Sequence, residues 1–242
     1  MTVLSVNLNK LALLRNSRGH NYPDLLHYAR RFIGLGVHGL TIHPRPDERH
    51  IKQQDARDLA ALLKDYPEVE FNIEGYPSEA FLQLVEACQP TQCTLVPDTE
   101  AQLTSDHGWD FIQHLETLKP LIARLKKSAI RVAVFIDPEP DQIKLAAQSG
   151  ADRIELYTEE FCRQYGHDDS ERVLVQYRNA AILAQSLGLG VNAGHDLNLL
   201  NLPAFLNIPD ILEVSIGHAL TIECIDQGIE KVVAQYLKIC QG

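Results

Sequence analysis

The sequence predicts a single (β/α)8 barrel over residues 1–242, and three observations favour this fold class. Short apolar segments alternate with segments of helical periodicity at steps of roughly thirty residues, as parallel βαβ units do. Several apolar segments end at an ionisable or hydrogen-bonding residue, and such barrels build their active sites at the carboxyl ends of their strands. A glycine turn comes just before three of the segments, at Gly36, Gly150 and Gly188. The length and an apolar content of 45% suit one domain with a large core.

Eight short segments rich in apolar or β-branched residues are the expected strands. The first of them alternates apolar and polar residues and ends near Asn7 and Asn9. The expected strands are residues 3–8, 39–43, 70–74, 92–96, 131–137, 153–158, 189–193 and 211–216.

Apolar residues at helical spacing predict a helix between most neighbouring strands. Asp24 and Ser78 are expected to cap two helices, because short polar side chains accept hydrogen bonds from the first helical N–H groups. Residues 10–24 combine positive charges with a Gly/Pro cluster and are expected to form a long functional loop. Residues 97–109 are expected to form a second loop that closes over the site. The expected helices are residues 24–35, 52–64, a segment that starts at 77–78, 110–127, 141–149, 170–187 and 221–240.

The competing architecture is an open, doubly wound sheet. Such a sheet usually carries a glycine-rich phosphate loop after its first strand. Residues 7–19 contain neither Gly-x-Gly-x-x-Gly nor a Walker motif, so the barrel is favoured.

The composition narrows the class of partner. A formal net charge of −10 argues against nucleic acid and against an anionic membrane, because both attract positive surfaces. The five cysteines lack Cys-x-x-Cys spacing and are interpreted as reduced, structural thiols. Residues 1–9 carry no signal-peptide pattern, and no segment is long and apolar enough to span a bilayer, so we expect a cytoplasmic protein.

His43, Glu74 and His195 form the candidate acid–base set. Each is expected at the mouth of a different strand, and two imidazoles beside a carboxylate can be tuned to exchange protons near neutral pH. A single histidine at a strand end is often only a hydrogen-bonded support. The catalytic hypothesis therefore depends on the three residues occurring together.

Cationic side chains in the loops after the first two strands indicate an anion site. In an acidic protein they favour capture of phosphate or carboxylate groups, which arginine can bind with two hydrogen bonds. The alternative is a solvated loop in which Asp47 and Glu48 pair with the arginines, and it suits Arg49 better than Arg45. The set comprises Lys10, Arg18, Arg45, Arg49 and His50.

Glycines end the seventh and eighth expected strands, in Gly194-His195 and Gly217-His218. Just before a helix, a glycine leaves the backbone N–H groups accessible to a phosphate at the helix N-terminus. The alternative is that both glycines only relieve crowding.

The sequence has no His-x-His and no His-Glu-x-x-His motif, so we expect no metal site.

The strand-end segments are similar to those of one enzyme family, and the similarity runs through most of the chain. The segments that carry it are residues 14–19, 41–51, 72–74, 95–97, 135–137, 191–195 and 216–219. The spacing His-x-Arg-x-Asp-x-Arg-His from His43 to His50 and the run Asn-Ala-Gly-His from Asn192 to His195 are specific when found together. On these residues the sequence resembles the pyridoxine 5'-phosphate synthase family, barrel enzymes that close the pyridine ring of vitamin B6.

The resemblance implies a reaction and a set of residue roles. The family joins 1-deoxy-D-xylulose 5-phosphate to 3-amino-2-oxopropyl phosphate, releases phosphate and water, uses no metal or organic cofactor, and forms homo-oligomers up to an octamer. His43 and Glu74 would accept protons and His195 would donate one. The deoxyxylulose phosphate would be held by Arg45, His50 and Thr104, with Asn9 and Lys10 at the first-strand contact. The aminoketone phosphate would be held by Asn7, Arg18, Gly194, Gly217 and His218, while Glu155 matches a supporting carboxylate.

Three departures from the common family pattern mark this chain as a branch. Asn9-Lys10 stands where many members carry Asp-His, so Lys10 is expected to meet the anion instead. Gly75-Tyr76 and Tyr157-Thr158-Glu159 replace other family patterns and indicate a rebuilt pocket wall. Two other functions stay open: a phosphosugar isomerase, epimerase or aldolase, and a non-catalytic barrel that binds phosphate ligands. An aldolase would need a strand lysine, and the expected strands contain none.

Overall fold

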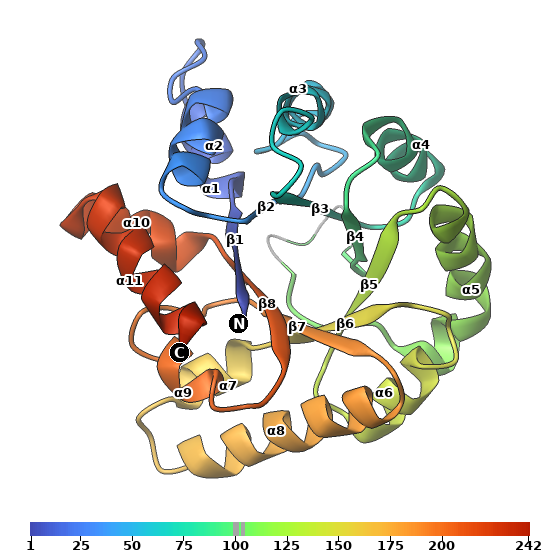
Figure 1. Ribbon diagram of the computed structural model, residues 1–242. Helices are drawn as coiled ribbons and strands as arrows, with labels where there is room; N and C mark the ends of the chain where they lie inside the picture. Colours follow the sequence, from blue (N-terminus) through green and yellow to red (C-terminus); the bar gives the residue numbers. More distant parts are fainter. Residues whose placement is uncertain (99–101, 103–104) are drawn as a thin grey trace.

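Eight parallel strands close into a barrel in the computed structural model, which describes residues 1–98, 102 and 105–242 (Figure 1). Strands that are neighbours in sequence are neighbours in the ring, and β8 pairs with β1 to close it. The strands are β1 (Val3–Asn7), β2 (Gly39–Ile42), β3 (Glu70–Gly75), β4 (Gln92–Leu95), β5 (Arg131–Ile136), β6 (Arg153–Tyr157), β7 (Gly190–Gly194) and β8 (Ile211–Ile216). The predicted fold class is confirmed, and each predicted strand lies within one residue of the observed bounds.

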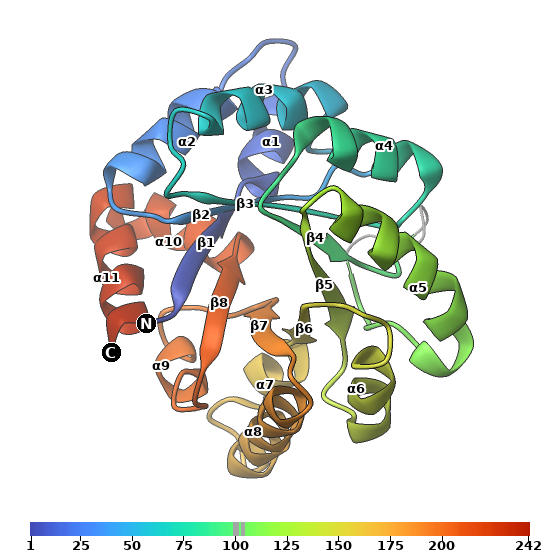
Figure 2. The ribbon, with the colours of Figure 1, turned by 45° about the vertical axis from the view of Figure 1, so that its right-hand side comes forward.

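Helices cover the outside of the barrel (Figure 2). They are α1 (Asn9–Asn16), α2 (Leu25–Gly34), α3 (Gln53–Leu63), α4 (Glu79–Cys88), α5 (Phe111–Lys127), α6 (Pro140–Ala146), α7 (Glu159–Gln164), α8 (Ser170–Ser186), α9 (Leu202–Phe205), α10 (His218–Gln227) and α11 (Ile229–Gln241). The two predicted N-caps are confirmed, because the side chain of Asp24 accepts from the N–H of Leu26 and that of Ser78 accepts from the N–H of Phe81.

Two parts of the helix prediction are wrong. Residues 10–24 are not one long loop, because α1 occupies their first half and buries Ala12 and Arg15. The closing helix is not continuous, because Gly228, with φ of 88°, separates α10 from α11. The short helices α7 and α9 were not predicted, since too few turns are present to reveal a helical period.

The glycines that precede three strands have the conformation expected of them. Gly36, Gly150 and Gly188 have φ of 92°, 86° and 83°. A residue with a side chain rarely adopts this left-handed region, so each glycine lets the chain leave a helix and turn sharply into the next strand.

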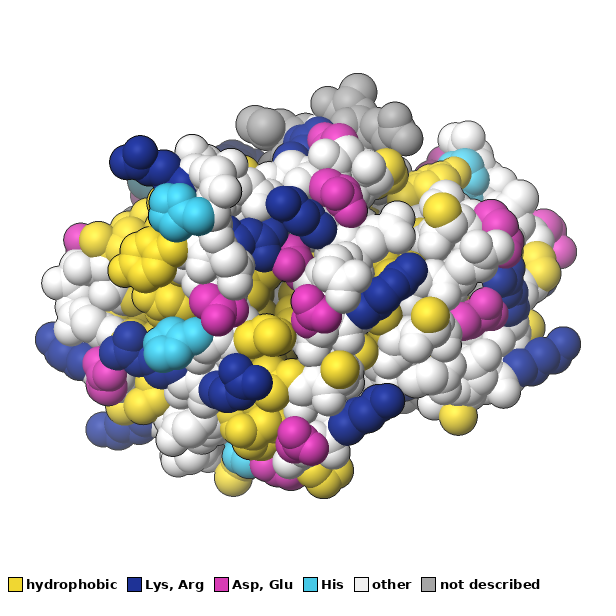
Figure 3. Space-filling model, turned by 90° about the horizontal axis from the view of Figure 1, so that it is seen from above, with side chains coloured by type: hydrophobic (Ala, Val, Ile, Leu, Met, Phe, Trp, Pro, Cys, Tyr) yellow, Lys and Arg dark blue, Asp and Glu magenta, His cyan; other side chains and the backbone are white. Residues whose placement is uncertain are grey.

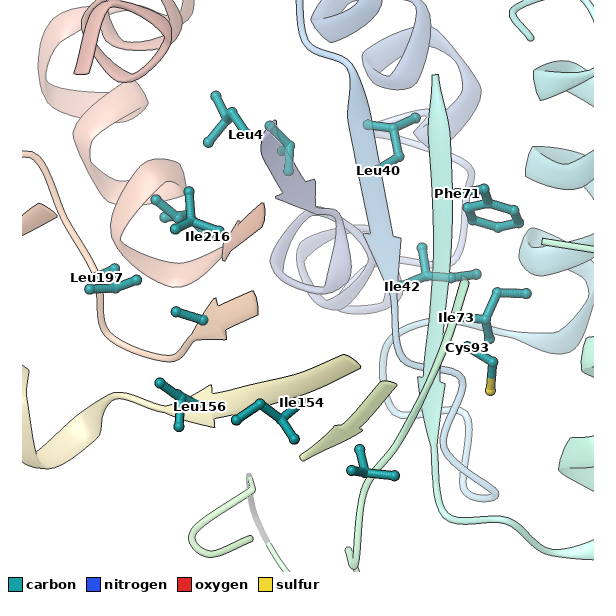
Figure 4. Close-up of a cluster of buried hydrophobic side chains, with 14 of the residues drawn as sticks. Leu4, Leu40, Ile42, Phe71, Ile73, Cys93, Ile154, Leu156, Leu197 and Ile216 are labelled. Atoms are coloured by element: carbon teal, nitrogen blue, oxygen red, sulfur yellow. The ribbon is translucent and has the colours of Figure 1, made fainter. Parts of the chain in front are cut away.

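The hydrophobic core lies between the strands and the helices. Alternate residues of each strand point outward into this layer, as Leu40 and Ile42 do on β2 and Phe71 and Ile73 on β3 (Figure 4). All four side chains are almost fully buried. The apolar layer fixes the register of the strands, and therefore which residues point inward.

The inward-facing residues of several strands are polar and bond across the barrel. The hydroxyls of Ser5 and Thr41 lie 2.7 Å apart, and the Thr94 hydroxyl donates to Asn72 Oδ1 over 3.0 Å. Because side chains alternate, Glu74 shares the inward direction of Asn72. The barrel therefore presents a carboxylate at the open end of β3.

The two ends of the chain meet at the opposite end of the barrel. The N–H of Thr2 donates to the carbonyl of Cys240, which ties α11 to the start of β1. Figures 1 and 2 show both termini together on that side. In the described part of the chain, no helix combines the length and the apolar character needed to cross a membrane.

Candidate active site

A pocket of about 450 Å³ opens at the carboxyl ends of the strands. It is the face on which (β/α)8 barrels carry their active sites, and residues from β1, β2, β3, β4, β6, β7 and β8 or from the segments that follow them contribute to it. The lining comprises Asn7, Asn9, Lys10, Leu13, His43, Arg45, Arg49, His50, Glu74, Ser105, Glu155, His195, Asp196, Leu197, Ser215, Ile216, Gly217, His218 and Ala219.

The structure brings most of the predicted site residues together in this pocket. All three members of the acid–base set line it. So do the predicted substrate contacts Asn7, Asn9, Lys10, Arg45, His50, Glu155, Gly217 and His218. Arg18 is exposed and Gly194 is buried, and neither is among the lining residues. Thr104 lies outside the described residues, so its predicted contact with substrate stays a prediction.

His43 follows β2 and is anchored through its backbone. Its N–H donates to Asn9 Oδ1 over 2.9 Å, and the N–H of Asn9 donates to Asn7 Oδ1 over the same distance. Burial lowers the pKa of the His43 imidazole well below 6.5, and the neighbouring His50 and Arg45 lower it further. The ring is therefore neutral near pH 7 and able to accept a proton.

Glu74 faces the pocket from the end of β3. Burial raises the pKa of its carboxyl group well above 4.5, and the nearby carboxyl groups of Glu155 and Glu213 raise it further. The pKa of Glu155 is itself raised to about 8, chiefly by burial. The site thus holds carboxyl groups that exchange protons closer to neutral pH than ordinary glutamates do.

His195 has an unusual backbone conformation for a residue with a side chain. Its φ is 86°, and its ring packs against Phe135 and Tyr157 at centroid distances of 5.3 and 5.1 Å. Burial lowers the pKa of the imidazole, while the charge of Asp196 opposes this shift. The ring is held at the pocket by packing and by the backbone.

The loop after β2 supplies cations, but their partners differ from one another. Arg49 pairs with Asp47 at 2.7 Å, as the alternative interpretation expected. Arg45 is buried, and its guanidinium pairs with Asp98 at 2.8 Å and donates to the carbonyl of Gln102. The sequence did not reveal this pairing, since Asp98 belongs to the loop after β4.

His50 is held in one orientation at the pocket edge. Its Nδ1 accepts a hydrogen bond from the N–H of Ile51 over 2.9 Å, so in the neutral ring the proton lies on Nε2. Burial, together with Arg45 and Lys10, lowers the pKa of His50 to about 4. His50 therefore offers an uncharged N–H donor at neutral pH.

The two glycines that were predicted to hold phosphates have different surroundings. Gly217 is the N-cap of α10, and a Cβ there would lie 3.0 Å from the Cβ of Asn7. This fits the predicted role, because the first N–H groups of a helix attract anions. Gly194 is not followed directly by a helix, which corrects the prediction. A Cβ there would lie 2.3 Å from Glu155 Oε1, so this glycine makes room for that carboxyl group.

Some pocket residues were missed by the sequence analysis. Ser215 lies two residues before Gly217 on β8, so strand alternation alone could have placed it on the same face. Ser105 donates to Asp98 Oδ2 over 2.8 Å, a contact that no local pattern indicates. No group of three or more His, Cys, Asp or Glu in the described ranges has an arrangement that could hold a metal ion.

The surface charge is mixed. On the face shown in Figure 3, basic and acidic side chains are interspersed, and neither sign forms a continuous area. On this face the charges therefore form no extended surface of one sign.

Comparison with known families identifies the chain. Residues 4–242 match the model of a family described as "Pyridoxal phosphate biosynthesis protein PdxJ". The chain belongs to this family. The suspected resemblance is thereby confirmed, and the barrel described above is the fold of a PdxJ-family member.

Curated relatives in the PdxJ family match the chain along its whole length. A protein of Flavobacterium johnsoniae named "Pyridoxine 5'-phosphate synthase" is 52% identical over 239 residues, which cover 98% of this chain and 99% of the relative. A protein of Chelativorans sp. (strain BNC1) with the same name is 49% identical over 246 residues, covering 99% and 98%.

Solved structures resemble the PdxJ-family chain in fold. A phosphoribosylanthranilate isomerase from Thermotoga maritima superimposes with a TM-score of 0.60 at 13% identity, and each chain is covered completely. An N-(5'-phosphoribosyl)anthranilate isomerase from Pyrococcus furiosus gives a TM-score of 0.60 at 11% identity, covering 100% of this chain and 99% of the other. At such identities the likeness concerns the barrel alone.

Proposed function

We propose that this chain is a pyridoxine 5'-phosphate synthase, which condenses 1-deoxy-D-xylulose 5-phosphate with 3-amino-2-oxopropyl phosphate. The observation that carries the proposal is the meeting of His43, Glu74 and His195 in one pocket whose rim bears cationic side chains and a helix N-terminus. Imine formation, elimination and ring closure are successive proton transfers, and three acid–base groups suit them. The names of the relatives support the same reaction.

Two phosphorylated substrates require two anion sites, and the pocket offers two different kinds. On one side, Lys10 and the neutral His50 can donate to the sugar phosphate. Arg45 forms an ion pair with Asp98, and in this proposal its guanidinium orients that phosphate while the pair remains intact. On the other side, the α10 N-terminus at Gly217 and His218, next to Asn7, would receive the phosphate of the aminoketone.

The pKa shifts of the three acid–base residues support a direction for each proton transfer. His43 is neutral because burial lowers its pKa, so it is ready to accept a proton. Burial raises the carboxyl pKa of Glu74, which lets it take up and return a proton at a higher pH than an ordinary glutamate does. Burial lowers the pKa of His195, so its imidazole is also neutral in the free protein. A bound phosphate dianion would raise this pKa, so the imidazole would bind a proton, which it then donates.

The proposal extends to the assembly and the compartment. By resemblance to its family, the chain forms a homo-oligomer up to an octamer. The same resemblance assigns the exposed Arg18, which follows α1, to the aminoketone phosphate site. Unpaired thiols suit a reducing compartment, and all five cysteines are free, so we place the reaction in the cytoplasm.

The decisive experiment is product detection. Purified protein is incubated with both phosphates, and pyridoxine 5'-phosphate is sought by mass spectrometry, with each substrate omitted in turn. Product is expected only when both substrates are present. Conversion of the sugar phosphate alone would instead identify an isomerase or epimerase, and binding of both ligands without product would identify a non-catalytic barrel.

A further inference from the structure

The backbone at His195 is in a conformation that side chains disfavour. His195 and Asp196 have φ of 86° and 57°, so two successive residues other than glycine lie in the left-handed region. Residues with a side chain rarely adopt this conformation, and it persists only where surrounding contacts hold it. Something in the structure must therefore fix this segment.

Thr158 makes the contacts that hold it. This residue follows β6 and is fully buried. Its hydroxyl lies 2.7 Å from the carbonyl oxygen of Gly194 and within hydrogen-bond distance of the carbonyl oxygen of His195. Its backbone N–H also donates to the Gly194 carbonyl over 3.0 Å. One residue thus binds both peptide carbonyls that flank the turn at the strand end.

The ring of His195 depends on this backbone for its direction. In the described part of the chain no side chain or backbone group hydrogen-bonds to its imidazole, and the ring only packs between Phe135 and Tyr157. Tyr157 is the residue directly before Thr158, so one short segment supports both the ring and the backbone of His195. The Cys162 thiol adds a weaker contact of 3.5 Å to the His195 carbonyl.

We propose that Thr158 is a positioning residue for His195: its hydroxyl holds the left-handed peptide that aims the imidazole into the pocket. Thr158 itself is not among the residues that line the pocket, so it acts through His195. The inference rests on the role of His195 as proton donor under the proposed function. Without the hydroxyl, the peptide can relax towards an ordinary conformation and the ring turns away from the reacting atoms.

Three variants test the proposal. Thr158→Val has nearly the same shape and lacks the hydroxyl, whereas Thr158→Ser keeps it. Thr2→Val is the matched control, because the Thr2 hydroxyl also donates to a backbone carbonyl, that of Ile211, at 2.8 Å and far from the pocket. We expect Thr158→Val to lower kcat by about tenfold or more, as expected for the loss of one hydrogen bond and of alignment, with both KM values within about threefold. Thr158→Ser and Thr2→Val should retain near-normal kcat.

A second readout does not require turnover. Histidine resonances of the labelled protein are titrated by NMR, and the His195 signal is assigned from its loss in His195→Gln. In Thr158→Val the imidazole should become more hydrated, so the pKa of His195 should move up towards 6.5. Normal kcat together with an unchanged His195 titration would overturn the proposal.

Failure of the proposed function is distinguishable from failure of this inference. If the wild-type protein makes no product, the reaction is wrong, yet the NMR comparison still reports whether Thr158 orients His195. If Thr158→Val does not fold, Thr158→Ala replaces it, since the smaller side chain cannot clash. The comparison with Thr158→Ser then decides between the two groups of the side chain. If kcat is lost in Thr158→Ala and retained in Thr158→Ser, the hydroxyl and not the methyl group is required.

Discussion

Glu74 combines two properties of a proton-transferring residue, since it faces the pocket and burial raises its carboxyl pKa. A glutamate that only pairs with a neighbouring arginine would have a structural role instead. In the described residues no arginine forms an ion pair with Glu74. The carboxyl group is thus available for chemistry, and its neighbours are other carboxyl groups.

Glu74→Gln should abolish most turnover and leave the fold intact. Glutamine has nearly the same shape but cannot exchange a proton, so single-turnover ring closure should slow by about 10²–10⁴. The thermal midpoint should stay within about 4 °C of the wild type, because the variant loses no ion pair. Both quantities are measured on one preparation. A destabilised variant with near-normal turnover would remove Glu74 from the catalytic set.

Lys10, which was predicted to contact the sugar phosphate, lines the pocket. Lys10→Met keeps most of the side-chain length and removes the charge. Affinity for deoxyxylulose phosphate should fall by roughly tenfold or more, as expected for a lost charge-assisted hydrogen bond of about 1.5–3 kcal/mol. Titration of each substrate measures the effect, with Lys231→Met on the exposed face of α11 as the control. Equal affinity in both variants would mean that Lys10 is only a solvated charge.

At the scale of elements, α1 holds the loop that connects β2 to α3. The side-chain amide of Asn16 donates to the backbone carbonyl of His50 over 2.8 Å and also reaches the carbonyls of Glu48 and Arg49. Arg15 adds a bidentate ion pair to Asp55, in the first turn of α3, at 2.6 and 2.8 Å. The helix α1, whose residues were predicted to form a loop, therefore orders the connection between β2 and α3. This connection carries cationic side chains of the pocket.

Asn16→Ala should loosen this loop and weaken substrate binding. The residue does not line the pocket, so the effect is transmitted through the backbone of His50. We expect KM for the sugar phosphate to rise severalfold, with a smaller change in KM for the aminoketone phosphate, because three carbonyl contacts are lost on one side of the pocket. Steady-state kinetics measure both values. Gln83→Ala on α4 loses only a local bond to Glu79 and serves as the control. A parallel rise in both KM values would contradict a local effect.

At the scale of the whole molecule, the barrel buries more carboxyl groups than it neutralises with ion pairs. Burial raises the pKa of Glu155 to about 8 and that of Glu213 to about 7, from an ordinary value of 4.5. Of these two carboxyl groups, only Glu213 forms an ion pair among the described residues, with Arg153 at 3.7 Å. Between pH 4.5 and its raised folded-state pKa, such a carboxyl group is protonated in the folded protein, whereas the same group in the unfolded chain has lost its proton. Its contribution to stability is therefore lost as the pH rises from 4.5 through the folded-state pKa.

Glu155→Gln should remove part of this pH dependence. Between about pH 5 and pH 9, the wild type should lose a few kcal/mol of unfolding free energy relative to the variant, since each pKa unit corresponds to about 1.4 kcal/mol. Urea unfolding of both proteins at the two pH values measures the difference. The lowered pKa of His43 acts in the opposite direction below pH 6.5, but it is common to both proteins. Glu116→Gln, at an exposed position of α5, should behave like the wild type. A constant difference between Glu155→Gln and wild type would show that Glu155 ionises normally.

The sequence by itself determined the barrel and the position of His43, Glu74 and His195 at strand ends that meet in one pocket, because both depend on local periodicity. Period-two alternation on β3 was enough to turn Glu74 inward, and the glycine turns marked where strands begin. The strand ends then had to converge, since parallel strands in a closed barrel direct all their carboxyl ends to one face. Family recognition came from the same strand-end residues.

Only the tertiary structure decided which side chains pair across the pocket. The ion pair of Arg45 with Asp98, the fit of Gly194 against Glu155, and the hold of Thr158 on His195 all join residues that lie far apart in sequence. No local pattern encodes such contacts, because each depends on how two loops approach one another after the barrel has closed. The segment of α1 was predicted to be a loop because of its charges for the same reason. Its Arg15 is in fact buried and bonds to α3, a contact that no local pattern indicates. Periodicity acts along the chain, whereas these contacts are set by the distance between strands and loops in space.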